Sequence, residues 1–243
     1  MPKYSHNFYK DKPQETFYPA NTIIQAVLDI LPEIHSVVDF GCGVGAWLAA
    51  IKDRGIDNIQ GFDGPWVDQN LLTIPLENFK RTDLSQEILL DQKYDLAISL
   101  EVAEHLPETS ARTFVKSITN ASDFVLFSAA IPLQGGTHHV NEQWQDYWAS
   151  LFKEHNYETI DLIRAQIWDD EKIPYWYKQN ILMFVKQERL ADLKIHHPDS
   201  STSKLPLRLV HPDIYLSKIN KMNTIKGSMK SFRRAIKKIL GFS

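Results

Sequence analysis

The chain has 243 residues, 43% of them hydrophobic, and a formal charge of −3 at pH 7, which suits one α/β domain with extensions. Its single cysteine, Cys42, excludes an internal disulfide framework, and this suits a reducing compartment. The longest nearly apolar run, residues 124–133, is far shorter than the roughly 20 residues of a membrane-spanning helix. The first residues lack the apolar core of a signal peptide, so we expect a soluble, cytoplasmic protein.

The expected elements alternate between helix and strand along most of the chain. Residues 1–20 are polar and aromatic without a clear period, and we expect them to cover the ligand crevice as a lid. A helix is expected over 21–31, because its apolar residues fall on one face. From residue 34 to about 186, short apolar segments predict a mainly parallel sheet, and the last strand, 180–185, should close its edge. Clusters of His, Pro and Ser indicate a linker over 187–213.

A glycine-rich turn within residues 36–47 is the most informative segment. An apolar run leads to Asp39, the turn contains Gly41 and Gly43, and a helix is expected from Ala46. Ligands of open α/β sheets bind outside the carboxyl ends of the strands, where glycine lets the backbone approach them closely. The same residues satisfy the loose dinucleotide pattern G-x-G-x-x-A, so a NAD-dependent enzyme is one alternative. A carboxylate would repel a pyrophosphate, however, so Asp39 favours a ligand with an amino group.

Residues 39–45, with the pattern D-x-G-x-G-x-G, closely resemble the first motif of class I S-adenosylmethionine (SAM)-dependent methyltransferases. Further segments follow in the order of that family. Asp63 ends an expected strand and corresponds to the acid that binds the ribose, and Asp83 lies where an acid approaches the adenine. Residues 101–107 resemble the motif that follows the fourth strand, expected over 94–100. The resemblance implies SAM as the cofactor, bound by Asp39, Gly41, Cys42, Gly43, Asp63, Asp83, Leu84, Ser99 and Glu101.

The resemblance also implies the fold. This is a Rossmann-like class I methyltransferase sandwich over residues 21–186, with a seven-stranded, mainly parallel sheet that has one antiparallel edge strand. Some of these residues, taken singly, also suit a structural role. Asp83 also suits the N-cap of a helix over 85–91, and Glu104 with His105 also suits a solvated helix entry.

The segment after the expected fifth strand, 124–127, is the candidate acceptor side, because residues 128–148 are dense in polar and aromatic groups. A hydroxyl is a poor nucleophile while it is protonated, and histidine titrates in the range that a base requires. We therefore expect His139 to be the catalytic base, with Glu142 three residues later on the same face. The histidine also suits a capping or packing role, or half of a metal site. No third ligand has motif spacing, so no metal is expected.

A narrower resemblance covers about residues 15–186. The series of segments 134–144, 147–152, 161–168 and 176–180 is similar to methyltransferases encoded with bacterial surface-polysaccharide assembly enzymes. It implies a saccharide acceptor bound by His105, His138, Asn141, Trp144, Arg164, Trp168 and Lys178, although Lys178 stands where arginine is expected. Two or three aromatic residues of the second half should line the pocket, from the set Trp144, Tyr147, Trp148, Trp168, Tyr175, Trp176 and Tyr177.

The carboxyl-terminal tail, 214–243, has a charge of +8 and no acidic residue, whereas the rest of the chain carries −11. Within it, residues 228–240 place apolar side chains at helical spacing with basic ones opposite. A basic amphipathic helix is typical of a segment that binds an anionic membrane surface. Docking on the acidic body or on a partner protein remains an alternative. Nucleic acid is not expected, because the rest of the chain would repel it.

These patterns together predict a SAM-dependent O-methyltransferase that acts on a saccharide or lipid-linked glycan during surface-polysaccharide biosynthesis, by in-line methyl transfer. A lipid or a quinone-like small molecule is the alternative acceptor. A non-catalytic SAM-binding protein or membrane scaffold is the alternative of another class. The oligomeric state is not predicted.

Overall fold

The computed structural model describes residues 12–194 and 207–222 together with 224, 228, 229, 232 and 236. The chain divides into two units, Met1–Arg208 and Leu209–Ser243. The first unit contains one sheet, and its strands are β1 Ser36–Phe40, β2 Asn58–Asp63, β3 Phe79–Arg81, β4 Leu96–Leu100, β5 Phe124–Ser128, β6 Tyr157–Ile160 and β7 Leu182–Lys186.

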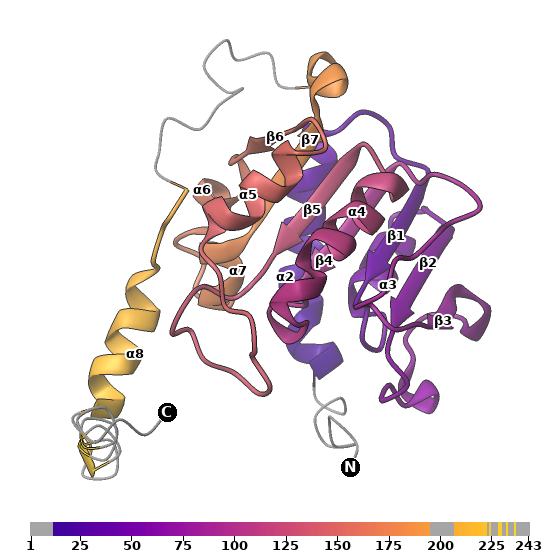
Figure 1. Cartoon of the computed structure of the whole chain (residues 1–243). Helices are drawn as coiled ribbons and strands as arrows, with labels where there is room; N and C mark the ends of the chain where they lie inside the picture. The colour runs from indigo at the N-terminus through magenta and orange to yellow at the C-terminus, as the bar shows by residue number, and fades with distance from the viewer. Residues whose placement is uncertain are drawn as a thin grey trace. The chain divides into compact units, whose positions relative to one another are not determined.

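The sheet has seven strands in the order β3-β2-β1-β4-β5-β7-β6 (Figure 1). The first five strands of the chain run parallel, and β7 runs antiparallel to both β5 and β6. This confirms the seven-stranded, mainly parallel sheet. The expected place of the last strand is wrong, because β7 lies inside the sheet and β6 is outermost. The buried run Leu182 to Val185 explains this, since a strand buried on both faces suits an inner position.

The helices cover both faces of the sheet (Figure 1). Because successive residues of a strand face opposite ways, Val37 packs in one apolar cluster, while Val38 and Phe40 pack in the other. The first cluster includes α2 and α3, and the second includes α4 and α5. The helices of this unit are α2 Lys12–Ile30, α3 Ala46–Lys52, α4 Ala111–Ala121, α5 Gln145–Lys153, α6 Ile163–Ile167 and α7 Tyr175–Asn180. Its 3-10 turns are η1 Gln69–Leu71, η2 Leu76–Asn78, η3 Ala103–His105, η4 Glu108–Ser110 and η5 Gln187–Asp192.

Three expected boundaries differ from the structure. The first helix begins at Lys12 rather than at residue 21, so residues 12–20 are helical rather than an irregular segment. No helix occupies residues 85–91, because Asp83 Oδ1 instead accepts hydrogen bonds from the Ser85 N–H (3.0 Å) and hydroxyl (2.7 Å) in a local turn. The expected linker, 187–213, starts with the 3-10 helix η5 and ends within α8, and residues 195–206 lie outside the described part.

The second unit contains α8, Pro212–Met222, in which Ile214 is buried and Tyr215 and Leu216 are exposed. Of the expected amphipathic helix 228–240, the structure describes only residues 228, 229, 232 and 236, which are helical. The basic residues of that segment lie outside the described residues. None of the helices in the described part of the chain is both long and apolar enough to span a bilayer.

Candidate active site

The carboxyl ends of β1, β2 and β4 open into a cavity of about 710 Å³. This volume lies within the range of small-molecule sites. The cavity wall also includes residues that follow β5 and residues of α7. The cavity is lined by eight of the residues that the sequence predicted for the site, namely Gly41, Cys42, Gly43, Asp63, Leu84, Glu101, His105 and His139.

The glycine turn between β1 and α3 has a backbone that side chains rarely allow. Gly41 has φ +91°, and a Cβ atom on it would lie 2.3 Å from Val102 Cγ2. The Gly41 and Cys42 N–H groups donate to the carbonyl of Phe62, at 2.7 and 3.2 Å. Glycine is therefore required at position 41 by backbone conformation and by the lack of space.

Asp63 ends β2 beside this turn, as the sequence predicted. Its Oδ2 accepts a hydrogen bond from the Gly43 N–H at 2.7 Å, and its Oδ1 accepts one from the Gly64 N–H at 2.6 Å. Two backbone donors thus fix the carboxylate at the cavity wall, close to the strand end where ribose hydroxyls bind in related βαβ units.

Asp39 does not line the cavity but lies buried behind the turn, 2% exposed. Its Oδ2 accepts no hydrogen bond from the residues that the structure describes. Burial raises the pKa of Asp39 well above its usual range, and the charge of Asp63 raises it further. Burial also raises the pKa of the Cys42 thiol, with Asp39 and Asp63 acting in the same direction, which disfavours the thiolate form.

Glu101 follows β4 in a left-handed conformation, with φ 56°. Such a backbone costs of order 1–3 kcal/mol and is retained where the surroundings enforce it. The Asn180 amide donates to Oε1 and the Gln134 amide donates to Oε2, both at 3.0 Å. Burial raises the pKa of Glu101, and these hydrogen bonds oppose the rise. The sequence did not predict a role for either amide, because Gln134 and Asn180 are distant from Glu101 along the chain and meet it only in the folded protein.

His139 and Glu142 form the pair that the sequence predicted. The His139 Nδ1 atom lies 2.9 Å from Glu142 Oε1. The same carboxylate accepts hydrogen bonds from the backbone N–H groups of Gly135 (2.6 Å) and Leu133 (2.7 Å). His139 lines the cavity and Glu142 stands behind it. The carboxylate therefore holds the histidine ring in one orientation.

Glu104 lies next to this pair and is 0% exposed. Neither carboxylate oxygen has a hydrogen-bond partner among the described residues. Burial raises the pKa of Glu104 well above its usual range, and the neighbouring Glu101 raises it further. The Glu104 carbonyl accepts the N–H groups of Val140 (2.9 Å) and Asn141 (3.0 Å), which attaches the 138–142 segment to η3.

Several predicted acceptor residues do not line the cavity. Arg164 is buried in an ion pair with Asp161 and donates to the carbonyls of Gln179 and Leu207, so its guanidinium stabilises the fold. The buried Lys178 donates from Nζ to the carbonyl of Asp170 at 3.1 Å. The cavity wall also lacks Asp83, Ser99, His138, Asn141, Trp144 and Trp168.

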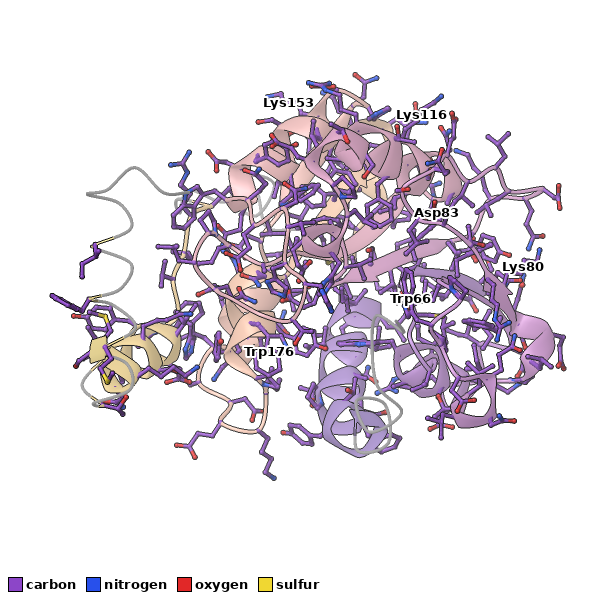
Figure 2. The ribbon with its side chains drawn as sticks, turned by 60° about the horizontal axis from the view of Figure 1, so that its bottom comes forward. Trp66, Lys80, Asp83, Lys116, Lys153 and Trp176 are labelled. Carbon is purple, nitrogen blue, oxygen red and sulfur yellow. The ribbon has the colours of Figure 1, made fainter. Side chains whose placement is uncertain are left out.

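Particular contacts explain some of these positions. Asp83 is exposed at the turn after β3 (Figure 2), and Ser99 is buried within β4. The Arg208 guanidinium lies over the Trp144 ring, 5.7 Å from its centroid. His138 is exposed at φ 60°, and Asn141 is buried.

Aromatic side chains form much of the remaining wall. Tyr175, Trp176 and Tyr177 line the cavity, which confirms that two or three of the expected aromatic residues do so. Trp66, from the loop after β2, also lines it and was missed from the sequence (Figure 2). The ring packs close to the backbone of Gly64, where a Cβ atom would lie 2.2 Å from it, but the sequence alone gave no signal of this contact.

The pattern of a family described as a methyltransferase domain matches residues 14–166. No curated protein sequence matches the chain significantly. Two solved structures have a similar fold. Human N-acetylserotonin methyltransferase in complex with SAM is 14% identical, with a TM-score of 0.52 over 74% of this chain and 55% of that chain. An O-methyltransferase family protein from Burkholderia thailandensis is 12% identical, with a TM-score of 0.53 over 74% of this chain and 58% of that chain.

This chain thus spans little more than half the length of those two proteins. The family match covers more than half of the chain, and it agrees with the sheet order and with the glycine turn. The chain belongs to the methyltransferase domain family and is a SAM-dependent methyltransferase of the class I fold.

Proposed function

We propose that this methyltransferase transfers a methyl group to a hydroxyl oxygen of a saccharide. The proposal rests on the pair formed by His139 and Glu142, whose Nδ1 and Oε1 atoms lie 2.9 Å apart. His139 lines the same cavity as the glycine turn and Asp63. A base is useful to a hydroxyl acceptor, because oxygen becomes a good nucleophile only when its proton leaves.

The cofactor half of the cavity fits SAM. Gly41, Cys42 and Gly43 line this part of the cavity, so a bound ligand would lie directly against the backbone of the turn. Asp63 and Leu84 line the same cavity, where Asp63 would accept hydrogen bonds from ribose hydroxyls and Leu84 would contact the adenine. Bound SAM supplies an electrophilic methyl group on a sulfonium sulfur.

His139 has the geometry of a base in the acceptor half. With its Nδ1–H donated to Glu142, the other nitrogen, Nε2, is the proton acceptor. A base in this position contributes about 10²–10⁴-fold to the rate. The remainder of the acceleration comes from holding the hydroxyl in line with the methyl group.

Aromatic walls support a saccharide as the acceptor class. Trp66, Tyr175 and Trp176 offer ring faces that pack against the C–H face of a sugar ring. Glu101, Gln134 and His105 add polar groups on the same cavity, which can bind sugar hydroxyls. A lipid or quinone-like acceptor requires fewer polar groups, so we rank it second.

The basic tail, 214–243, is the reason for including lipid-linked glycans among the acceptors. Polybasic segments gain about 1 kcal/mol for each Lys or Arg near an anionic membrane surface. We propose that the tail holds the enzyme at the cytoplasmic face of such a membrane, near a glycan carried on a lipid.

The test uses SAM with a labelled methyl group and three acceptor fractions: lipid-linked glycans, soluble sugars and sugar-free lipids. We expect label in a sugar-containing fraction, and a loss of about 10²–10⁴-fold in the His139→Ala variant. His35→Ala is the control, since the His35 side chain is 71% exposed and does not line the cavity. Label only in sugar-free lipid would overturn the saccharide, and full activity of His139→Ala would overturn the base.

A further inference from the structure

The acceptor side of the cavity contains three potential metal ligands that the proposed function does not use together. Glu104, His105 and His139 each offer one ligand atom, and these atoms lie within 4.8 Å of one another. His105 and Glu104 belong to η3, whereas His139 comes from the loop after β5. The two imidazole rings stand at 85° with their centroids 4.8 Å apart.

Glu104 is the member whose environment requires an explanation. Its side chain is fully buried, and both oxygens lack partners among the described residues. Buried polar groups almost always have partners, because a buried donor or acceptor left without one is destabilising. Protonation would remove the charge of Glu104 but would still leave an O–H and a carbonyl oxygen without hydrogen bonds. A cation between Glu104 and the two histidines supplies the missing partner.

One ring nitrogen of each histidine already lies near a polar group of the protein. The His105 Nδ1 atom lies 3.4 Å from the carbonyl oxygen of His138, and Glu142 binds the Nδ1 of His139. A carboxylate on the distal nitrogen of a metal-binding histidine is a common arrangement, because it fixes the tautomer and the ring orientation. Gly136 also permits this ring position, since a Cβ atom there would lie 2.1 Å from His139 Nε2.

We propose that Glu104, His105 and His139 bind a divalent cation at the acceptor end of the cavity. One carboxylate and two imidazoles suit Zn²⁺, Mn²⁺ or Fe²⁺ better than Ca²⁺ or Mg²⁺, which prefer oxygen ligands. Ligands about 2.1 Å from such an ion lie roughly 3–4 Å apart, so the cluster closes by about an ångström on binding. Three protein ligands leave coordination positions open to an acceptor hydroxyl.

The cation changes how the acceptor loses its proton. This consequence rests on the proposed transfer to oxygen, whereas cation binding itself does not. A coordinated hydroxyl has a lowered pKa, so its proton passes to solvent while Nε2 of His139 serves as a ligand. The oxygen then forms the bond to the methyl carbon, and the electron pair of the broken S–C bond stays on sulfur. His139 is the base only in the cation-free enzyme.

Binding is measured first, without any acceptor. The full chain is stripped with a chelator and titrated with MnCl₂, followed by the electron paramagnetic resonance of free Mn²⁺, and with ZnCl₂ by calorimetry. We expect one equivalent to bind. Glu104→Gln and His105→Ala should each weaken binding by more than about 100-fold, and Glu142→Gln by about 10–100-fold. His35→Ala should bind as the unchanged protein does.

The outcomes separate this proposal from the proposed function. SAM binding by each stripped variant reports whether the fold and the cofactor site remain intact. If the stripped protein binds SAM but no cation, or if Glu104→Gln and His105→Ala bind cation as tightly as His35→Ala, the metal site is overturned and the proposed function stands. If cation binds as expected while no saccharide is methylated, the proposed function fails and the metal site stands.

Discussion

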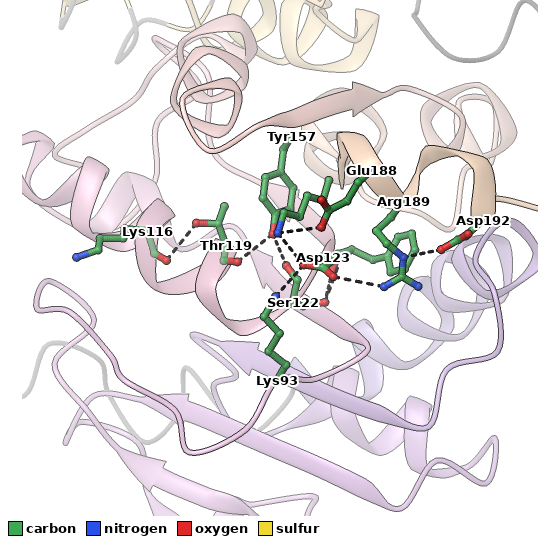
Figure 3. Close-up of polar contacts among 11 residues, drawn as sticks. Lys93, Lys116, Thr119, Ser122, Asp123, Tyr157, Glu188, Arg189 and Asp192 are labelled. Atoms are coloured by element: carbon green, nitrogen blue, oxygen red, sulfur yellow. Dashed lines mark hydrogen bonds and ion pairs between the residues drawn. The ribbon is translucent and has the colours of Figure 1, made fainter.

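Carboxylates at the two ends of the sheet differ in whether they have partners. At the amino end of β5, Asp123 accepts a hydrogen bond from Lys93 at 3.0 Å and pairs with Lys186 and Arg189 (Figure 3). At the carboxyl end, Asp39 and Glu104 have oxygens without hydrogen-bond partners among the described residues.

The pKa values follow this division. Burial alone would raise the pKa of Asp123. The hydrogen bond and charge of Lys93, together with the charges of Lys186 and Arg189, outweigh burial and hold the pKa below its usual value. Burial raises the pKa of Asp39 and of Glu104. The amino end therefore has paired charges, as expected of a structural cluster, whereas the cavity end retains buried carboxylates without hydrogen-bond partners among the described residues.

The cavity end of the sheet should be most sensitive to substitution at the glycine turn. In Gly41→Ala, the new Cβ would meet Val102 at 2.3 Å, and the φ of +91° would strain any side chain. We expect SAM binding to fall by at least about 100-fold, because overpacking and strain each cost about 1–3 kcal/mol. Calorimetry of SAM binding measures this.

The matched control is Gly55→Ala, which has φ +82° and nothing within 4 Å of the added Cβ. It should lose about 1–2 kcal/mol of stability and bind SAM unchanged. Equal loss of SAM binding in both variants would contradict the importance of the turn.

Asp63→Asn should weaken SAM binding by about 10–100-fold, because hydrogen bonds to a charged group contribute about 1.5–3 kcal/mol. Asp83→Asn is its control, since Asp83 is exposed and lies outside the cavity wall. The ratio of the two dissociation constants is the measurement. A larger loss of SAM binding in Asp83→Asn would instead support the adenine-binding role that the family resemblance implies for Asp83.

Asp123→Asn should reduce the free energy of unfolding by about 1–2 kcal/mol at pH 7 and leave SAM binding unchanged. Because the folded pKa of Asp123 is lowered, its stabilisation is present above about pH 4 and is lost as the pH falls through the folded value. Urea unfolding at a series of pH values should show less acid sensitivity in the variant. Loss of SAM binding without loss of stability would place Asp123 in the functional region instead.

The smallest effect is expected at the aromatic wall. Trp176→Ala should raise the KM for the acceptor by about two- to tenfold, since an aromatic contact contributes about 0.5–1.5 kcal/mol. Trp144→Ala should leave it unchanged, because Trp144 contacts Arg208 outside the cavity wall. Steady-state kinetics with each variant tests the assignment, and the reverse order of effects would refute it.

More of the residues predicted for the cofactor than of those predicted for the acceptor line the cavity. Asp39, Gly41 and Asp63 lie at strand ends, and their places follow from a local pattern together with the order of a parallel sheet. The contact between His105 and His139 joins two separate loops, so no local spacing could reveal it.

The prediction that Arg164 and Lys178 bind the acceptor did not allow for their burial. Arg164 and Lys178 have the residue types that an acceptor anion would need, yet backbone carbonyls from other segments surround them. The expected position of the last strand failed for a similar reason. Its antiparallel direction was correct, but only the pairing of β6 with β7 places another strand outside it.

Transfer to a sugar oxygen is tested by following a ¹³C-labelled methyl group from SAM to the product by nuclear magnetic resonance. We expect one new O-methyl carbon signal on a sugar ring, which is lost in His139→Ala and kept in His35→Ala. An N-methyl or C-methyl signal would contradict transfer to oxygen. Absence of any transferred label to the saccharide fractions, from a protein that binds SAM, would contradict the proposed acceptor.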